Sequence, residues 1–420
     1  MRKIKCAAGI NATVHVPGSK SYSHRTAIAA ALSNGICSIF DYLNSDDTNY
    51  TLDAITQLGV NIENNKDTID VHGCAGGFAP GPKSIYLGNS GTSMRLLTAV
   101  SALGQGPYEF SGTGRMHERP IGELLDALAQ AGVSARSMNN NNCPPVEIRG
   151  GNITGRKVSI DCTKSSQYLS GLLLMAPCTE NGLDIRVTAG PVSGPYVEMT
   201  ADIMSGFGIR YERSGLTDFR VPGGQTYAAG AYTVEPDCSQ AGYFWAAAAI
   251  TGGRVKVAGI TADTRQGDIR FVSVLEEMGC RVSYDPDGIT VTGGRLFAVD
   301  ADMKDMPDLV PTLAVVAAFA EGTTIIRNVA HLRAKESDRL AAVANELAKM
   351  KIDGHITEDG LRITGGSPQG AEIDTYDDHR IAMSFAVAGL AVPAVAVRNP
   401  SCVEKSFPGF WEVLEGLYAK

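Results

Sequence analysis

The stretch Leu58-Gly59-Val60 closes an amphipathic segment and leads into a strand-like one. A glycine at such a point is typical of a helix C-terminus, where one residue adopts a positive φ. The pattern returns every 71 to 76 residues, at Ala131-Gly132-Val133, Phe207-Gly208-Ile209, Met278-Gly279-Cys280 and, without the glycine, Met350-Lys351-Ile352. This period is too long for a solenoid of helix pairs, and it predicts a compact βαβαββ unit repeated along the chain. A chance recurrence of helix-stop glycines is the alternative.

Length and composition bound the number of domains and the kind of partner. At 420 residues the chain has room for about six repeats, which predicts two domains of three units each. Hydrophobic residues make up 44% and charged residues 20%, a globular composition. The net charge of -8 argues against a general binder of nucleic acid or anionic membranes. Any small anion must therefore be held by a local cluster of Lys and Arg.

The cysteines and the apolar stretches indicate the compartment. Nine cysteines are scattered without a CxxC pair, and the first residues lack the apolar core of a secretory signal. We therefore expect reduced, mostly buried thiols in a cytoplasmic protein. The apolar stretch 381–397 is broken by Ser384 and Pro393, which predicts a buried helix followed by a strand rather than a membrane span.

Polar clusters, most of them containing Lys or Arg, precede several apolar helices. Ser, Thr, Asn and Asp are ordinary N-caps, because their oxygens accept from the free N–H groups of the first turn. Lys and Arg are unexpected there, since a cation opposes the helix dipole. Each cluster alone could be a solvated cap, but the set indicates helix N-termini that bind small anions. The clusters span residues 19–25, 89–95, 165–167, 335–339 and 378–380.

An Arg-rich loop, residues 112–122, belongs with these clusters. Arg115 and Arg119 flank the start of a helix in which Pro120 is expected at an early position. The sequence has no Walker motif, no GxGxxG after a strand, no HExxH and no His/Cys cluster with metal-ligand spacing. It therefore predicts no metal, no cofactor and no nucleotide site.

Taken together, these clusters resemble the signature of the enolpyruvyl transferases, specifically the 5-enolpyruvylshikimate-3-phosphate (EPSP) synthase branch. Residues 17–25 are similar to the opening motif of that family, and residues 87–95 and 115–122 are similar to its two signature stretches. The remaining matches, in the expected order, are Ser165-Ser166-Gln167, 335–339, 378–380 and Lys405. The resemblance covers the chain from about residue 10 to 415.

The resemblance implies a fold and a domain order. It implies a two-domain inside-out α/β barrel protein, in which each domain has three βαβαββ repeats. Residues 1–18 and 236–420 are expected to form one discontinuous domain, and residues 19–235 an inserted one. The first would carry the phosphoenolpyruvate-side catalytic residues and the second would mainly bind shikimate-3-phosphate. The active site is expected in the cleft between them, closing around shikimate-3-phosphate.

The resemblance also implies an activity in aromatic amino-acid (chorismate) biosynthesis. The carboxyvinyl group of phosphoenolpyruvate is transferred to the 5-hydroxyl of shikimate-3-phosphate, and phosphate is released. The hydroxyl adds to C2 while C3 is protonated, and loss of phosphate restores the double bond. Lys20, Asp308 and Glu336 are the candidates for the proton transfers, with Asp308 and Glu336 expected on different helices. Which group performs each transfer stays open.

Substrate ligands follow from the same resemblance. Both substrates are polyanions, so bringing them together requires strong cationic compensation. The residues similar to shikimate-3-phosphate ligands are Lys20, Ser21, Arg25, Ser165, Ser166, Gln167, Ser193, Tyr196, Asp308, His331 and Lys335. Those similar to phosphoenolpyruvate ligands are Lys20, Asn89, Gly91, Thr92, Arg119, Gln167, Glu336, Arg339, Arg380 and Lys405. The Gly91 and Thr92 context also resembles that of glyphosate-sensitive members.

Three positions depart from the family pattern. Gly194 stands where Lys is common, His331 where Asn is frequent, and Leu96 where many relatives have Pro. One phosphate contact, one substrate contact and the degree of glyphosate sensitivity are therefore open.

Other functions fit the sequence less well. A UDP-N-acetylglucosamine enolpyruvyl transferase usually has a Cys in the loop that here spans 112–122, and this loop has none. A non-catalytic phosphosugar-binding protein would have lost Lys20 or the carboxylates. An RNA-end-processing relative would need a catalytic His and a basic surface. We expect a monomer whose partners are small-molecule substrates, with no nucleic acid and no membrane.

Overall fold

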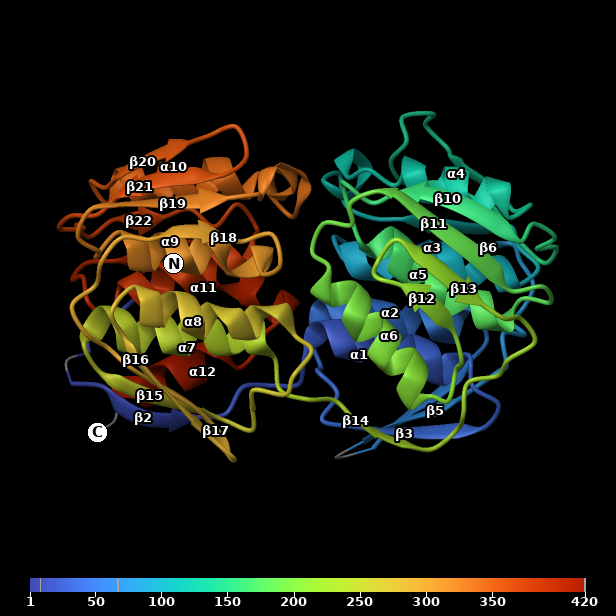
Figure 1. Ribbon diagram of the computed structural model, residues 1–420, viewed down its shortest axis with the longest axis horizontal. Helices are drawn as coiled ribbons and strands as arrows, with labels where there is room; N and C mark the ends of the chain where they lie inside the picture. The colour runs from blue at the N-terminus through green and yellow to red at the C-terminus, as the bar shows by residue number, and fades with distance from the viewer. Residues whose placement is uncertain (8, 66–67, 419–420) are drawn as a thin grey trace. The chain divides into compact units, whose positions relative to one another are not determined.

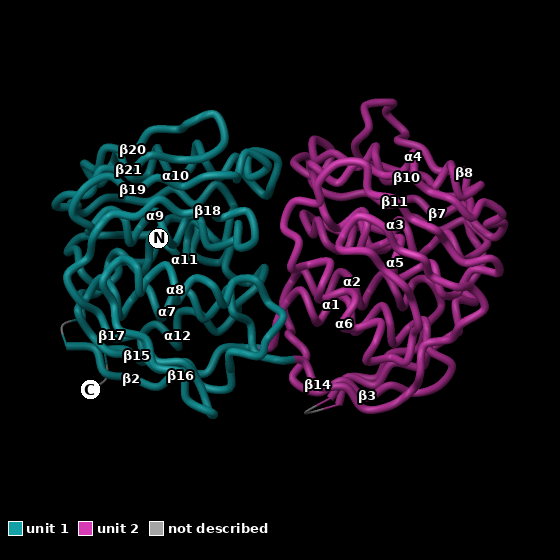
Figure 2. Tube along the Cα trace, in the orientation of Figure 1, with its two compact units in different colours: residues 1–17, 235–420 teal, residues 18–234 magenta. Residues whose placement is uncertain are grey.

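The computed structural model describes residues 1–7, 9–65 and 68–418, and the chain divides into two units. Unit 1 comprises Met1–Pro17 and Glu235–Lys420, and unit 2 comprises Gly18–Val234 (Figure 2). Each transition along the chain lies one residue before the boundary expected from the sequence.

Unit 2 is built from sheets that share one strand order. The first strand runs parallel to the second, and the last two strands form an antiparallel hairpin beside the second. The sheets are β14 (Ala231–Thr233), β3 (Ile36–Phe40), β5 (Thr68–His72) and β4 (Asn61–Asn64); β6 (Lys83–Tyr86), β7 (Tyr108–Ser111), β9 (Val146–Arg149) and β8 (Ser134–Ser137); and β10 (Lys157–Asp161), β11 (Leu183–Ala189), β13 (Asp218–Val221) and β12 (Glu212–Ser214). Their helices are, pairwise, α1 (Lys20–Ala31) and α2 (Asp46–Gln57), α3 (Gly91–Val100) and α4 (Gly122–Gln130), and α5 (Gln167–Met175) and α6 (Pro195–Gly206).

Unit 1 repeats this plan (Figure 1). Its sheets are β16 (Arg281–Asp285), β17 (Gly288–Thr292), β15 (Arg254–Ala258) and β2 (Asn11–Val14); β18 (Asp300–Asp302), β19 (Thr323–Arg327), β21 (Leu361–Thr364) and β20 (Asp353–Ile356); and β1 (Arg2–Lys3), β23 (Ala396–Val397) and β22 (Glu372–Ile373). Its helices are α7 (Cys238–Thr251), α8 (Phe271–Glu277), α9 (Val310–Ala317), α10 (Arg339–Lys349), α11 (His379–Ala388) and α12 (Phe410–Glu415). The last sheet has three strands among the described residues, so the predicted βαβαββ repeat is incomplete there.

Strands from distant parts of the sequence complete one sheet in each unit. In unit 2, β14 pairs in parallel with β3, with Ala231 opposite Ser38. In unit 1, β2 pairs in parallel with β15, with Asn11 opposite Arg254. In each unit, one sheet is therefore completed by a strand that is remote in sequence from the other strands of that sheet.

The two helices of a repeat differ in burial, and this difference gives the units their layers. The first helices, α1, α3, α5, α7, α9 and α11, are buried almost all round, whereas the second helices are apolar on one side only. The strands of β10 and β13 alternate buried and exposed residues, as expected for sheets with one face on the core and one in water. Helices thus fill the interior of each unit and sheets form its outer layer.

The repeated Leu-Gly-Val-like triplets lie at the C-termini of the second helices. Gly59, Gly132, Gly208 and Gly279 have φ between +80° and +108°, and Lys351 has φ of +62°. In each case the amide N–H bonds back to a carbonyl of the last helical turn, and a strand follows. The predicted helix ends are confirmed, including the degenerate copy.

The remaining expectations about burial hold in part. Stretch 381–397 forms the buried remainder of α11 and continues to β23, as predicted. Among the described helices, none combines the length and apolarity needed to cross a membrane. All nine cysteines are free thiols, but only four are fully buried and Cys6 is exposed.

Candidate active site

Each predicted polar cluster lies at a helix N-terminus in the structure. Helix α1 begins at Lys20, α3 at Gly91, α5 at Gln167, α10 at Arg339 and α11 at His379. Ser19, Asp338 and Asp378 cap three of these helices, since their side chains accept from first-turn N–H groups. The sequence therefore located these helix starts correctly, and the caps explain why the chain turns into helix there.

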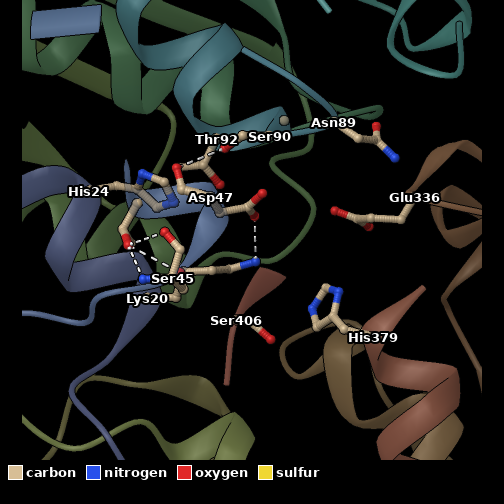
Figure 3. A network of polar contacts seen from close by, with 12 residues as sticks. Lys20, His24, Ser45, Asp47, Asn89, Ser90, Thr92, Glu336, His379 and Ser406 are labelled. Atoms are coloured by element: carbon tan, nitrogen blue, oxygen red, sulfur yellow. Dashed lines mark hydrogen bonds and ion pairs between the residues drawn. The ribbon is translucent and has the colours of Figure 1, made fainter. Parts of the chain in front are cut away.

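Lys20, the first residue of α1, is paired with a carboxylate of the neighbouring helix. Its Nζ lies 3.0 Å from Asp47 Oδ2, and the two side chains are 10% and 3% exposed (Figure 3). Asp47 lies in the first turn of α2, where a negative charge also suits the helix dipole. The pair fixes the ammonium group at the N-terminal edge of two adjoining helices.

Arg25 is a buried cation surrounded by neutral oxygens. Its Nε donates to Thr200 Oγ1 at 2.8 Å, and its terminal nitrogens donate to the carbonyls of Ser21 and Tyr196 and to Ser170 Oγ. The residue is 1% exposed, and burial lowers the pKa of the guanidinium to about 10. Among the described residues no carboxylate pairs with Arg25, so its charge is available to an anionic ligand.

The N-terminus of α3 lies against Arg119. Arg119 donates from Nη1 to the carbonyl and side-chain oxygens of Asn89, at 3.0 and 3.1 Å. A Cβ added at Gly91 would overlap the guanidinium groups of Arg119 and Arg95, so either side chain would have to shift to admit a larger residue. The expectation for Pro120 is wrong: it lies before the N-cap Ile121, outside the first turn of α4.

The remaining predicted ligands of unit 2 lie at two helix starts. Gln167 opens α5 and donates from Nε2 to Thr92 Oγ1 at 3.0 Å, which joins α5 to the first turn of α3. Ser166 occupies the N-cap position of α5 without a capping hydrogen bond from its side chain, and Ser165 Oγ accepts from Gln167 N at 3.2 Å. Ser193 is 4% exposed with φ of +55°, and its buried Oγ has no hydrogen-bond partner among the described residues. Such a hydroxyl suits a ligand contact.

Arg339 forms the centre of a buried ionic cluster in unit 1. It donates from Nε to Asp378 Oδ2, from Nη1 to Asp308 Oδ1 and from Nη2 to Glu336 Oε2, at 2.8, 2.8 and 2.9 Å. Although burial opposes the charged form, the carboxylates Asp378, Glu336 and Asp308 raise the pKa of Arg339 above its ordinary value. The guanidinium is therefore charged at every accessible pH and fixed in orientation.

Asp308 joins this cluster to Arg380. Its Oδ2 accepts from Arg380 Nη2 at 2.9 Å, and Arg380 Nη1 donates to the Tyr243 hydroxyl at 3.2 Å. Asp308 lies in a single 3₁₀ turn, Pro307–Leu309, and Glu336 lies in the loop before α10. The expectation that these two carboxylates lie on different helices is wrong. Asp338, rather than an earlier residue, caps α10, so Glu336 remains outside the helix.

The structure also places His331 and Lys405, two other predicted residues of unit 1. His331 belongs to the 3₁₀ segment Ala330–Ala334, and burial, followed by the nearby Lys335, lowers the pKa of its imidazole to about 3. Its Nε2 is buried without a hydrogen-bond partner among the described residues. Lys405 ends the 3₁₀ segment Pro400–Lys405 and is 9% exposed. Asp308, Arg339, Arg380 and Glu336 thus form one connected cluster.

Comparison with known proteins shows the family of this chain. The family model of EPSP synthase (3-phosphoshikimate 1-carboxyvinyltransferase) matches residues 4–414. The chain belongs to the EPSP synthase family. The family predicted from the sequence motifs is confirmed.

Individual relatives of the EPSP synthase family match over nearly their whole length. A relative from Syntrophobacter fumaroxidans named 3-phosphoshikimate 1-carboxyvinyltransferase is 44% identical, covering 99% of this chain and 100% of its own. A relative of the same name from Methanoculleus marisnigri is 44% identical, covering 97% of each. The solved structure of EPSP synthase from Acinetobacter baumannii has a TM-score of 0.82 at 28% identity, covering 99% of this chain and 97% of that one. The predicted fold class is therefore also confirmed.

The ion pairs of two charged residues in this EPSP synthase family member were not predicted from the sequence. Asp47 follows Ser45 and Asp46, so it looks like an ordinary acidic residue of a first helical turn. Asp378 was expected as a cap, but its ion pair with Arg339 joins residues 39 apart in the sequence. The sequence does show carboxylates close to the clustered Lys and Arg residues. This indicates that ion pairs form, but it does not indicate which carboxylate pairs with which cation.

Proposed function

We propose that this chain transfers the carboxyvinyl group of phosphoenolpyruvate to the 5-hydroxyl of shikimate-3-phosphate and releases phosphate, in aromatic amino-acid biosynthesis. The observation that carries the proposal is a set of buried guanidinium groups at or beside helix N-termini. Arg25, Arg119, Arg339 and Arg380 are each between 1% and 4% exposed, in a chain of net charge -8. Burying a cation is costly unless it pairs with an anion. Arg339 and Arg380 pair with protein carboxylates, whereas among the described residues no carboxylate pairs with Arg25. Relatives at 44% identity bear the name of this activity.

For shikimate-3-phosphate we propose the residues of unit 2 around Arg25. Arg25 offers a guanidinium without a carboxylate partner among the described residues, which suits a phosphate monoester. Ser165, Ser166 and Ser193 add hydroxyl groups nearby in the fold, and Ser193 Oγ has no hydrogen-bond partner in the part of the chain that the structure describes. Ser21, Gln167 and Tyr196, with Lys335 and His331 from unit 1, complete the proposed set. The absence of Lys at Gly194 makes Arg25 the main phosphate cation.

For phosphoenolpyruvate we propose Arg119, Arg339, Arg380 and Lys405, with Lys20. Guanidinium groups bind carboxylate and phosphate oxygens bidentately, so their fixed orientation favours one pose of this small dianion. The backbone of Gly91 offers a helix N-terminus without a side chain, next to Arg119. Asn89, Thr92, Gln167 and Glu336 complete the proposed set. Residues of both units are thus proposed to act on one pair of substrates.

The reaction requires a base for the hydroxyl and an acid for carbon. We assign the 5-hydroxyl to Asp308, because two guanidinium groups hold it as a carboxylate. The hydroxyl oxygen bonds to C2 as its proton leaves, and C3 gains a proton from Lys20 or Glu336. Removal of a proton from C3 then expels phosphate and restores the double bond. The cations around phosphoenolpyruvate stabilise the charge on the departing phosphate.

Phosphate release from phosphoenolpyruvate tests the proposal directly. We expect release with shikimate-3-phosphate and none with the UDP-amino sugar substrate of the related transferases. Release with the UDP-amino sugar alone would overturn the substrate assignment. Lys20→Met and Asp308→Ala should each lower kcat by at least about 100-fold. Near-normal turnover in either variant would remove that residue from the chemistry.

We further propose that the enzyme is cytoplasmic and monomeric, acting on small molecules alone. The free thiols suit a reducing compartment. Light scattering of the purified protein at working concentration would give a single chain mass of 44.3 kDa, and a dimer mass would contradict the monomer.

A further inference from the structure

A layer of buried polar side chains lies one helical turn beneath the Lys20–Asp47 ion pair. Residues three or four apart lie on the same face of a helix. His24 follows Lys20 by four residues on α1, and Thr51 follows Asp47 by four on α2. Ser93 follows Ser90, the N-cap of α3, by three. The residues at these three positions are 0% exposed, so water does not reach them.

These side chains form one continuous chain of hydrogen bonds. His24 Nδ1 lies 2.7 Å from Thr51 Oγ1, and Thr51 Oγ1 lies 2.7 Å from Ser93 Oγ. Ser93 Oγ lies 2.6 Å from Ser90 Oγ. The chain ends at the carbonyl of Asp47, which lies 3.3 Å from Ser93 Oγ and 3.4 Å from Ser90 Oγ. The N-terminal turns of three helices are therefore joined through one buried path of hydrogen bonds.

The direction of the protons along this path depends on His24. Each hydroxyl group has only one proton to donate. If His24 carries its proton on Nδ1, it donates to Thr51, Thr51 donates to Ser93, and the serine protons are free to reach the Asp47 carbonyl. If Nδ1 is bare, Thr51 must donate to His24, and the serine protons are drawn back along the path. Only in the first arrangement does a serine hydroxyl donate a hydrogen bond to the carbonyl of Asp47, the residue whose carboxylate pairs with Lys20.

We infer that His24, Thr51 and Ser93 are positioning residues that hold the Lys20–Asp47 pair in register with the N-terminus of α3. The inference rests on the proposed function of Lys20. The three residues lie beneath the proposed reactive group and act through Asp47 and the helix backbones. A small displacement of a reacting group costs a large factor in rate, while binding through other side chains is retained. Loss of the path should therefore lower kcat more than it raises KM.

The discriminating variants are Thr51→Val and Thr51→Ser. Valine has nearly the same shape without the hydroxyl, so it interrupts the path between His24 and Ser93, whereas serine restores it. We expect Thr51→Val to lower kcat by about 10- to 100-fold with KM for shikimate-3-phosphate changed less than about threefold. Thr51→Ser should recover kcat to within about threefold of the parent. Should Thr51→Val not fold, Ser93→Ala interrupts the same path and replaces it.

Thr98→Val is the matched control. Thr98 lies on α3, is 0% exposed, and its Oγ1 has no hydrogen-bond partner among the described residues. The Thr98→Val substitution should therefore leave kcat unchanged. A parental kcat in Thr51→Val, or an equal loss in Thr98→Val, would overturn the inference.

The tautomer of His24 gives an independent readout that needs no activity. In ¹⁵N-labelled protein, the Nδ1 resonance of His24 should be that of a protonated nitrogen, and Thr51→Val should shift it. A bare Nδ1 would overturn the inference even if the enzyme is fully active. If the parent protein releases no phosphate, the proposed function fails, while this resonance still reports whether the path exists.

Discussion

Arg339 and Asp378 form an ion pair that is closed to solvent: Nε lies 2.8 Å from Oδ2, and the side chains are 2% and 0% exposed. The same carboxylate accepts from Arg380 N at 2.9 Å, which caps α11. It also accepts from Ser337 Oγ at 3.0 Å, in the loop before α10. The buried carboxylate of Asp378 thus fixes the start of α11 and the loop before α10, and it orients the guanidinium of Arg339.

Asp378→Asn should weaken phosphoenolpyruvate binding more than it destabilises the fold. Asparagine can still cap α11, but it leaves the buried Arg339 without its main charge partner. We expect kcat/KM for phosphoenolpyruvate to fall by at least about tenfold, measured by phosphate release. Asp338→Asn is the matched control, because Asp338 caps α10 without pairing with Arg339. An equal loss in both variants would show that capping, not charge, is responsible.

Arg25→Gln should act on shikimate-3-phosphate selectively. Glutamine keeps donors toward Thr200 and Ser170 but removes the buried charge that is proposed to bind phosphate. We expect KM for shikimate-3-phosphate to rise by about 100-fold, with KM for phosphoenolpyruvate changed far less. Arg156→Gln, on an exposed side chain, controls for the loss of one positive charge. A rise confined to phosphoenolpyruvate would reverse the assignment.

Asp268 should make the stability of unit 1 depend on pH. The residue is 3% exposed, its Oδ1 has no hydrogen-bond partner among the described residues, and burial, then Asp308, raises its pKa to about 7. Between about pH 4 and pH 7 the folded state keeps a proton that the unfolded state has released, so stability falls as pH rises. The asparagine of Asp268→Asn stays neutral at every pH. The Tm of this variant, relative to that of the parent, should therefore be higher at pH 8 than at pH 5. A constant difference in Tm would contradict this, and Asp353→Asn, exposed at its surface, is the control.

Gly91→Ala should alter the proposed phosphoenolpyruvate site. The added methyl group overlaps the ends of the Arg119 and Arg95 side chains, which can move only by shifting their guanidinium groups. We expect KM for phosphoenolpyruvate to rise by about tenfold or more. Glyphosate is expected to inhibit the parent in competition with phosphoenolpyruvate and to bind the variant more weakly. Gly206→Ala is the control, since nothing lies within 4 Å of its added Cβ; a parent insensitive to millimolar glyphosate would contradict the prediction.

His331→Asn should be tolerated. Because the imidazole pKa is lowered to about 3, His331 is neutral at assay pH and offers an N–H donor and a nitrogen acceptor, and the amide of asparagine also offers both a donor and an acceptor. We expect kcat/KM for shikimate-3-phosphate to stay within about threefold of the parent. His331→Leu, which has neither donor nor acceptor, should lower it further than that. Equal activity in both variants would remove His331 from the proposed site.

Local rules made the helix ends predictable. The positive φ at Gly59 and its counterparts follows from the chemistry of a helix C-terminus, which each copy of the repeat carries within a few residues. Helix starts are equally local, because a cap and its first turn are adjacent in sequence. For this reason even the degenerate copy at Lys351 lay where the spacing predicted.

Long-range pairing was not predictable in the same way. Strand β14 pairs with β3, almost two hundred residues earlier, and a three-residue strand has no distinctive pattern. The buried pairs Lys20–Asp47 and Arg339–Asp378 likewise join separate repeats or helices. The residues proposed as substrate ligands were therefore identified from family motifs and not from these long-range pairs.

The pairing of β2 with β15 has a consequence for synthesis of the chain on the ribosome. About 240 residues separate Asn11 from its partner Arg254, and these include all of unit 2. At roughly 5 to 20 residues per second, β2 waits about 10 to 50 s before its neighbour is made. Unit 2 can meanwhile complete every sheet from its own residues. The order of translation thus favours a folded unit 2 at a time when most of unit 1 has not been made and its first strands are still unpaired.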